Sequence, residues 1–409
     1  MKKLIGAVYF ILVCVYSVFS YSLTDPNLVL TTWQPYWQFQ QLMWHTFFNN
    51  SALLSETYII LITLLFACYF FLFFKRSVVL PHKKWLFIFI FILPLLFSYN
   101  ALSHDVFNYI FNAKMVLIYH ANPHVQIALD FPHDDWIRFM HNTNTPAPYG
   151  YLWTAISLIP FALGFGKFII TWSLFRIFSV LSVVLLAFSY KSLAQSEQHK
   201  KESLWQSFLL VFLNPLFLIE VISNSHNDLW MMAPALLSLA ILHQTKTVNL
   251  KRVLFSLILL SFSVSIKLST LVLIPIWGAI FIEQVLSQYQ LPKLIRQFTS
   301  FIHLHYADMA VLFLFVPLLT PRSQQFNPWY LVWLLVWLPF LRWSWLKDAL
   351  LVLSVSSLFR YVPWLLAGGY SDEIIFHQKI ITFAPLIIYL LAIASKQLLT
   401  RNSTSSRVE

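Results

Sequence analysis

Apolar stretches long enough to cross a bilayer recur along the whole chain, and mostly short polar segments separate them. A membrane-spanning helix needs about 20 apolar residues to cross roughly 30 Å of hydrocarbon. The pattern predicts about twelve membrane segments, at residues 4–22, 57–74, 84–100, 168–190, 204–222, 228–243, 253–266, 268–282, 308–321, 329–341, 348–366 and 374–395. The expected fold class is therefore all-α, a polytopic transmembrane helix bundle. Residues 151–165 form too short a stretch to span and predict a re-entrant or interfacial helix.

Several later segments are short, notably the two that meet at Lys267. Because broken helices at membrane depth are tolerated only beside protein or water, this pair indicates an internal cavity. Hydrophobic residues make up 59% of the chain and charged residues 11%, about half the charge of a soluble domain. No polar stretch is long enough for a separate domain. We therefore expect one transmembrane domain over residues 1–409, with an extracytoplasmic loop at 101–150.

Positive charge gathers in every second loop. If the first segment stays as a helix with its amino terminus inside, the cytoplasmic loops hold 19 of the 27 Lys and Arg residues. This bias follows the positive-inside rule and places both termini in the cytoplasm, although the first segment could instead be a cleaved signal peptide. The net charge of +11 is thus typical of membrane loops rather than of nucleic-acid binding. Cys14 and Cys68 lie in apolar segments and give no disulfide framework.

Acidic residues show the opposite bias, since Asp105, Asp130, Asp134, Asp135, Glu220, Asp228, Asp372 and Glu373 all map to the outer side. The loop at 101–150 is long, polar and aromatic, as functional loops commonly are. Its motif at 103–109 (SHDVFNY) places Asp105 where a helix leaves the membrane. Partial desolvation there can raise the pKa of a carboxyl group, which could act as a general base on a sugar hydroxyl. The alternative is a helix N-cap.

A second acidic motif, at 224–230 (NSHNDLW), lies between two apolar segments, with Glu220 two helical turns before Asp228. It either caps helices or faces the same cavity as Asp105. Three cations at the outer side are candidates for a lipid phosphate, namely Lys267, Arg322 and Arg360. Lys267 could instead snorkel to the interface, an explanation that fits Arg360 poorly because it lies midway along an apolar segment.

Histidines crowd the outer loop, at His104, His120, His124, His133 and His141. Imidazoles beside Asp134 and Asp135 would suit a divalent metal. Their spacing, however, matches no compact helical pair of ligands. The pattern allows a divalent metal site but does not support one, so we expect no metal and no other cofactor.

The order of these motifs resembles the integral-membrane GT-C glycosyltransferases, and most closely the polyprenyl-phosphate-mannose-dependent mannosyltransferases. The resemblance covers residues 95–345 and rests on Ser103, Asp105, Val106 and Tyr109, then Asn122-Pro123-His124, Tyr149-Gly150-Tyr151-Leu152-Trp153, His226-Asn227-Asp228, Lys267 and Pro328-Trp329-Tyr330. The family usually has Tyr in place of His124 and Pro in place of Tyr151. Both departures lie near the expected acceptor side, so they bear on the sugar and the acceptor more than on the fold.

What the resemblance implies is inverting transfer of mannose or another hexose from polyprenyl phosphate to an envelope glycan or glycolipid. Asp105 would be the catalytic base. The implied substrate-binding residues are Tyr109, Asn122, Tyr149, His226, Asn227, Asp228, Trp329 and Tyr330, and the lipid-phosphate-binding residues are Lys267, Arg322 and Arg360. The expected partners are this donor, the acceptor and membrane lipids, with no nucleic acid.

Two other classes of protein stay open. A multi-pass lipid or solute transporter or flippase would also have broken helices and charges within the membrane, but it should show two similar halves, and no internal repeat is evident. A non-catalytic subunit of an envelope-assembly complex would leave Asp105, Lys267 and Arg360 without a role.

Overall fold

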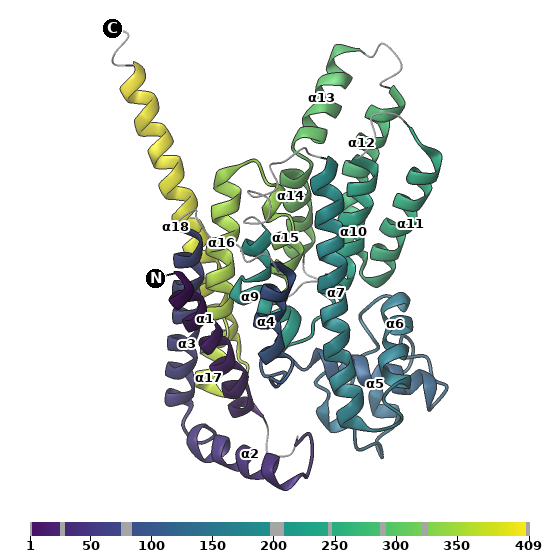
Figure 1. Cartoon of the computed structure of the whole chain (residues 1–409), viewed down its shortest axis with the longest axis vertical. Coiled ribbons are helices and arrows are strands. Elements are labelled where there is room, and N and C mark those ends of the chain that lie inside the picture. The colour runs from purple at the N-terminus through teal and green to yellow at the C-terminus, as the bar shows by residue number, and fades with distance from the viewer. Residues whose placement is uncertain are drawn as a thin grey trace.

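The computed structural model describes residues 2–24, 29–74, 84–196, 208–243, 248–286, 292–320 and 326–405, and all regular structure in these ranges is helical. The longer helices are α1 (Lys2–Phe19), α2 (Gln34–Phe47), α3 (Ser51–Phe74), α4 (Lys84–Leu95), α5 (Asp105–Leu117), α6 (Tyr151–Ala162), α7 (Phe168–Ser196), α10 (Asp228–His243), α11 (Leu250–Ile266), α12 (Ile274–Leu286), α13 (Lys293–Leu304), α14 (Tyr306–Leu318), α16 (Ser344–Phe359) and α18 (Asp372–Ser405). Shorter elements connect them, and Figure 1 shows their arrangement.

Six helices in the described part of the chain are long and apolar enough to cross a membrane. They cover Leu4–Leu23, Ser51–Phe73, Phe168–Ala194, Leu268–Leu286, Ser344–Ala367 and Asp372–Gln397. The pair α13 and α14, bent by 82° at their junction, makes a seventh if it is one broken span. The expectation of an all-α polytopic bundle is confirmed, and the chain is a multi-pass integral membrane protein.

Helices α10 and α11 cover the segments predicted at 228–243 and 253–266, whereas three other expected segments are shorter or more broken than predicted. In the segment predicted at 84–100, the helix ends at Leu95. The described part of 204–222 contains α9 (Pro215–Phe217) and the π-helical turn η4 (Leu218–Ser223), and α9 begins where the Asn214 side chain accepts a hydrogen bond from the amide of Leu216. The segment at 329–341 divides into η7 (Pro328–Leu331), α15 (Val332–Leu335) and η8 (Leu338–Phe340).

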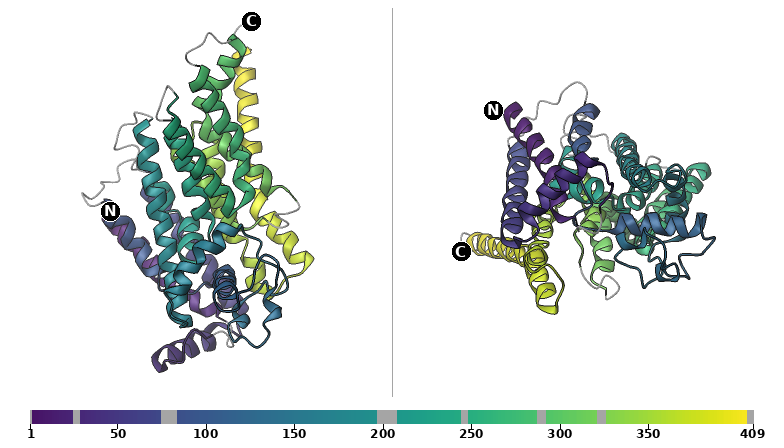
Figure 2. Two further views of the ribbon diagram at one scale, coloured as in Figure 1. Left: turned by 90° about the vertical axis from the view of Figure 1, so that its right-hand side faces the viewer. Right: turned by 90° about the horizontal axis from the view of Figure 1, so that it is seen from below.

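The break expected at Lys267 is present. Lys267 has an extended backbone (φ −147°, ψ 130°) between α11 and the 3₁₀ turn η5 (Leu268–Leu273). The stretch at 151–165, expected to be re-entrant or interfacial, forms the short helix α6. Helix α2 was not predicted from the sequence; it runs crosswise at one end of the molecule, the same end as α5 and α6 (Figures 1 and 2).

Helix α10 forms the centre of the bundle and packs against both α7 and α11. Serines make interhelical hydrogen bonds along these contacts: the Ser189 hydroxyl donates to the carbonyl of Ala233 (2.9 Å), and that of Ser263 to the carbonyl of Met231 (2.8 Å). Small hydroxyl side chains allow close approach of membrane helices and add hydrogen bonds between them. This packing fixes the beginning of α10, where the second acidic motif lies.

A buried arginine on α7 holds the broken segments together. The Arg176 guanidinium donates to the Leu96 carbonyl (2.9 Å), the Asn100 side-chain oxygen (2.9 Å), the Ser98 hydroxyl (2.8 Å) and the Ser223 carbonyl (3.1 Å). Two of these bonds, to Leu96 and Ser223, satisfy carbonyls that the ends of α4 and η4 leave without helical partners. Arg176 therefore fixes the segment that leads from α4 to Asp105.

Candidate functional site

Asp105 is the first residue of α5, and its side chain is 17% exposed. It lines a cavity of about 650 Å³. Segments far apart in the sequence enclose this cavity: His104 and His141 come from the outer loop, Trp329 from η7, and Tyr370 from the turn after α17 (Val362–Ala367). The cavity thus combines a carboxylate with imidazole and aromatic side chains, a lining suited to a sugar.

Buried beside Asp105 is His226, in the turn before α10. Its Nδ1 atom lies 3.5 Å from Oδ2 of Asp105, and its Nε2 atom lies 3.3 Å from Oε2 of Glu220. The imidazole ring stacks on Trp329 with ring centroids 4.2 Å apart. Burial lowers the pKa of His226, but the two carboxylates raise it by a larger amount, so that the pKa is about 9. His226 is therefore an imidazolium at neutral pH.

The pKa of Asp105 is shifted in the opposite direction to the one expected from the sequence. Burial alone raises the pKa of its carboxyl group, as expected. The neighbouring His226, the positive charge of Lys267 and the hydroxyl of Tyr149 outweigh that effect, and the pKa of Asp105 lies below its usual value. The expected raised pKa is wrong because the sequence does not show that His226 and Lys267 lie close to Asp105. Asp105 is an ionised carboxylate at neutral pH.

Lys267, at the break between α11 and η5, pairs with Asp228. Its ammonium lies 2.7 Å from Oδ1 of Asp228, which also accepts a hydrogen bond from the indole of Trp333 (2.5 Å). The same ammonium lies 5.6 Å from the ring centroid of Tyr149. Lys267 therefore has a fixed anionic partner in this structure, and its side chain turns inward rather than snorkelling.

Gly150 places Tyr149 next to this pair. Its amide donates to the carbonyl of Ile266 (2.8 Å), and a Cβ atom at Gly150 would lie 1.9 Å from the carbonyl oxygen of Ser265. Only glycine allows this approach of the loop to the end of α11. The ring of Tyr149 then packs against Tyr109 at 5.0 Å.

Several buried polar atoms around this cluster have no hydrogen-bond partner among the described residues. They include both side-chain amide atoms of Asn227 and Oδ2 of Asp228. Buried polar groups are nearly always satisfied in proteins, and exceptions mark functional sites or places that bind water or ligand. The cluster is therefore built to take up polar groups from a substrate or solvent.

The remaining sequence-predicted residues lie in different places. Tyr330 packs against Trp333 (5.0 Å), beside the cluster. Asn122 lies in the outer loop, where its side chain accepts a hydrogen bond from the amide of His124 in a local turn. Arg360 ends α16 and is buried, and neither of its terminal nitrogens has a hydrogen-bond partner among the described residues. Arg322 lies outside the described residues.

The histidines of the outer loop do not form a shared ligand set. His104 stacks on His141 with centroids 3.9 Å apart, and burial together with His141 lowers the pKa of His104 to about 3. His124 bonds to Thr154 (2.9 Å). Asp134 forms an ion pair with Lys114 (2.6 Å). Among the described residues, no three His, Cys, Asp or Glu side chains converge as metal ligands.

The structure thus brings Asp105, Tyr109, Tyr149, His226, Asp228, Lys267, Trp329 and Tyr330 into one region, and it leaves Asn122 at a distance in a surface turn. Sequence analysis assigned no role to Glu220 or Trp333, which contact this region directly. An acidic residue inside an apolar segment was the available signal for Glu220. Nothing in the sequence marked Trp333 apart from the other tryptophans.

A family model described as alpha-(1->6)-mannopyranosyltransferase, N-terminal domain, matches residues 4–283. The matched range covers about two thirds of the chain and contains Asp105, His226, Asp228 and Lys267. No curated protein and no solved structure matches the chain.

Proposed function

Because this chain belongs to the alpha-(1->6)-mannopyranosyltransferase family, and is therefore a glycosyltransferase, we propose that it transfers a hexose, mannose in the first instance, from a polyprenyl phosphate carrier to an envelope glycan or glycolipid. The observation that carries the proposal is an ionised carboxylate, Asp105, facing a cavity large enough for a sugar. The transporter alternative has no support from the family match.

In the proposed reaction, an acceptor hydroxyl oxygen attacks the anomeric carbon while the bond from that carbon to the phosphate oxygen breaks. Asp105 takes the hydroxyl proton as general base, and the polyprenyl phosphate leaves with the bonding electrons. Single displacement inverts the anomeric centre. A base of low pKa suffices because the hydroxyl becomes strongly acidic as its oxygen bonds to carbon. A phosphate leaving group needs no general acid.

Cations beside the cavity would stabilise the departing phosphate. Lys267 lies close enough to Asp105 to lower its pKa, and its ion pair with Asp228 keeps the ammonium in place. Arg360 lies near Tyr370, which lines the cavity, and its two terminal nitrogens have no hydrogen-bond partner among the described residues. Arg322 keeps its proposed role on sequence grounds alone. Tyr109, Tyr149, His226, Asn227, Trp329 and Tyr330 would surround the sugar or fix the groups that do, and Asn122 would act from the loop.

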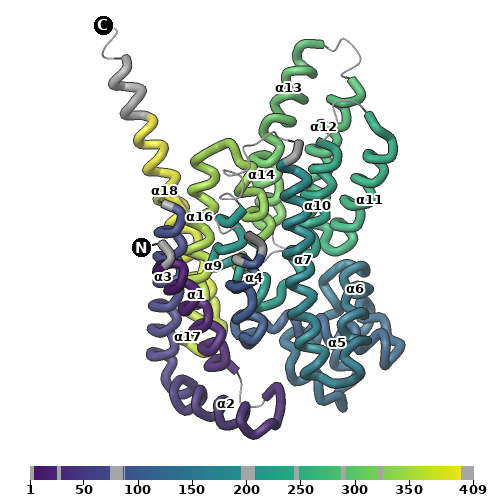
Figure 3. Tube along the Cα trace, in the orientation of Figure 1, coloured from purple at the N-terminus to yellow at the C-terminus, as the bar shows by residue number. Residues whose placement is uncertain are grey.

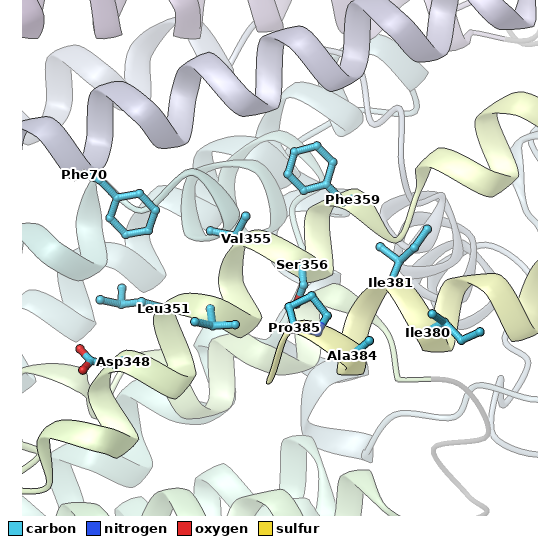
Figure 4. Close-up of a pocket in the computed structure, with 11 residues that line it drawn as sticks. Phe70, Asp348, Leu351, Val355, Ser356, Phe359, Ile380, Ile381, Ala384 and Pro385 are labelled. Carbon is cyan, nitrogen blue, oxygen red and sulfur yellow. The ribbon is translucent and has the colours of Figure 1, made fainter. Parts of the chain in front are cut away.

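The carrier lipid needs an apolar site that opens toward the bilayer. A groove of about 730 Å³ lies between α3, α16 and α18, and apart from Asp348 and Ser356 its lining is apolar (Figure 4). Phe359, which lines the groove, directly precedes Arg360. We propose that the isoprenoid chain lies in this groove with its phosphate at Arg360. We further propose that residues 1–409 form one transmembrane domain and that the site opens to the extracytoplasmic side, with both termini in the cytoplasm.

The purified protein in detergent or liposomes should transfer radiolabelled mannose from polyprenyl phosphate to an extracted envelope acceptor. Asp105→Asn keeps the shape of the side chain and removes the base, so we expect transfer to fall by at least about 100-fold, the usual contribution of a general base. Asp135→Asn, an exposed acid of the same loop, is the matched control and should keep full activity. Full activity in a folded Asp105→Asn protein would rule out the proposed base.

A further inference from the structure

His226 lies between two carboxylates, one at the cavity and one away from it. Its Nδ1 atom faces Oδ2 of Asp105 at 3.5 Å, and its Nε2 atom faces Oε2 of Glu220 at 3.3 Å. Asp105 lines the cavity, whereas neither His226 nor Glu220 does. The side chains of His226 and Glu220 are fully buried. This geometry gives the imidazole no direct access to a sugar in the cavity.

Glu220 is held firmly at the far side of the imidazole. The hydroxyl of Tyr361 donates to its Oε1 atom (3.0 Å), and the side-chain amide of Asn224 donates to its Oε2 atom (2.9 Å). The π-helical turn η4 carries Glu220, and such turns often occur at functional sites. A buried carboxylate with two neutral donors needs a cation nearby, and among the described residues only His226 forms an ion pair with it.

We propose that Glu220 is a positioning residue for the transfer reaction proposed above: it holds His226 as an imidazolium, and the imidazolium holds Oδ2 of Asp105. The other carboxylate oxygen, Oδ1, is then left to receive the acceptor proton. The imidazolium keeps its proton throughout, so no proton passes along the chain of three residues. Stacking on Trp329 fixes the plane of the ring.

Other charged and titratable groups also face this chain of residues. They are Lys267, Tyr109, Tyr149 and Tyr330 toward Asp105, His104 and His141 in the outer loop, Asp228 beside Lys267, and Tyr16, Tyr58 and Tyr361 toward Glu220. Burial lowers the pKa of both His104 and His141, so they are neutral where His226 is charged. His226 is therefore the group in this set with a pKa near 9, and it should set the alkaline limit of activity.

The test is the pH profile of kcat/KM for wild type and Glu220→Gln. In wild type, the rate should fall above about pH 9 as His226 loses its proton. Without the charge of Glu220, burial should lower the pKa of His226. The alkaline limb of the profile should therefore move down by about one pH unit or more, and each unit is a tenfold change in the protonation equilibrium of His226. The rate near pH 6 should change by less than about threefold, since the imidazolium is still present there.

Two further variants separate this role from a purely structural one. His226→Gln should lower the rate at all pH values and remove the alkaline limb, and adding Glu220→Gln to it should change nothing more. Glu373→Gln, at an exposed site on α18, is the matched control and should leave the profile unchanged. An equal loss of rate at every pH in Glu220→Gln, with its alkaline limb in place, would overturn the proposal.

A titration that does not depend on turnover distinguishes failure of this inference from failure of the proposed function. The ¹⁵N resonances of labelled histidines, assigned by comparison with His226→Gln, should show His226 titrating near pH 9 in wild type and at least about one unit lower in Glu220→Gln. If the resonances shift as expected but no transfer occurs, the positioning chain stands and the reaction is wrong. Titration of His226 near pH 6.5 in both proteins would refute the positioning role.

Discussion

Lys267 and Arg360 have different surroundings, although both were expected to bind a phosphate. Lys267 already has an anionic partner, Asp228, 2.7 Å away. Arg360 is only 2% exposed, and its terminal nitrogens have no hydrogen-bond partner among the described residues. A buried cation whose terminal nitrogens lack hydrogen-bond partners costs free energy in the folded protein, and an anionic ligand at Arg360 would offset that cost.

Arg360→Met should therefore weaken donor binding without destabilising the fold. A hydrogen bond to a charged group contributes about 1.5–3 kcal/mol, so the KM for the polyprenyl phosphate sugar should rise about tenfold or more. The midpoint of thermal unfolding should stay the same or rise, because an apolar side chain replaces an uncompensated charge. Initial rates over a range of donor concentrations and thermal unfolding in detergent measure both effects.

Arg138→Met provides the control, since Arg138 is an exposed arginine of the outer loop. It should alter neither the donor KM nor the midpoint of unfolding. A lower midpoint in Arg360→Met together with an unchanged donor KM would mean that Arg360 is structural.

Single residues were predictable from the sequence where a charge stood in an apolar setting, and their partners were not. Asp105, Asp228 and Lys267 were recognised in this way, whereas the pairing of Lys267 with Asp228 and of His226 with Glu220 depends on tertiary contacts. The direction of the Asp105 pKa shift depends on the nearness of His226, Lys267 and Tyr149 to Asp105, which is why burial alone predicted it wrongly.

At the scale of elements, the site depends on a contact between a loop and a broken helix. Gly150 meets the end of α11 where the chain leaves helical geometry at Lys267. Gly150→Ala would place Cβ 1.9 Å from the backbone oxygen of Ser265, so either the loop or the helix end must move. We expect a loss of about 1–3 kcal/mol in stability, as for other overpacked sites.

The same substitution should lower activity, because Tyr149 and Lys267 on either side of the contact would separate. Gly278→Ala is the matched control, since a Cβ atom at Gly278 would meet nothing within 4 Å and alanine favours the helix α12. Thermal unfolding and transfer rate are measured for both variants. Wild-type stability in Gly150→Ala would show that the loop adapts and that glycine is not required there.

The sequence predicted the long apolar helices and the break at Lys267, but not the breaks within 204–222 and 329–341. Hydropathy over a window cannot distinguish one continuous helix from α9 followed by a π turn, because both bury the same apolar residues. The amphipathic helices α2 and α13 were missed because their polar faces lower the mean hydropathy below that of a span. The breaks arise from caps and tertiary bonds, such as those of Asn214 and Arg176, that no local pattern contains.

At the scale of the whole molecule, the helices around the cavity and the basic loops lie toward opposite ends of the bundle. The outer-loop elements α5 and α6, together with α2, lie at one end, and α13 lies at the other, toward which α18 runs (Figures 1 and 3). The basic residues Lys251, Lys293 and Lys396, at the start of α11, the start of α13 and near the end of α18, belong to loops expected in the cytoplasm. From the positive-inside rule we therefore expect the cavity to open to the extracytoplasmic side.

This orientation can be tested by labelling single cysteines with a maleimide that does not cross membranes. Cys14 and Cys68 are the only native cysteines, so Cys14→Ser and Cys68→Ser together give a background without thiols. Asp135→Cys, exposed in the loop after α5, should react in intact cells, and Lys251→Cys, exposed at the start of α11, should react only after permeabilisation. The reverse pattern would place Asp105 in the cytosol. A polyprenyl-linked sugar presented at the outer leaflet could then not reach the proposed base.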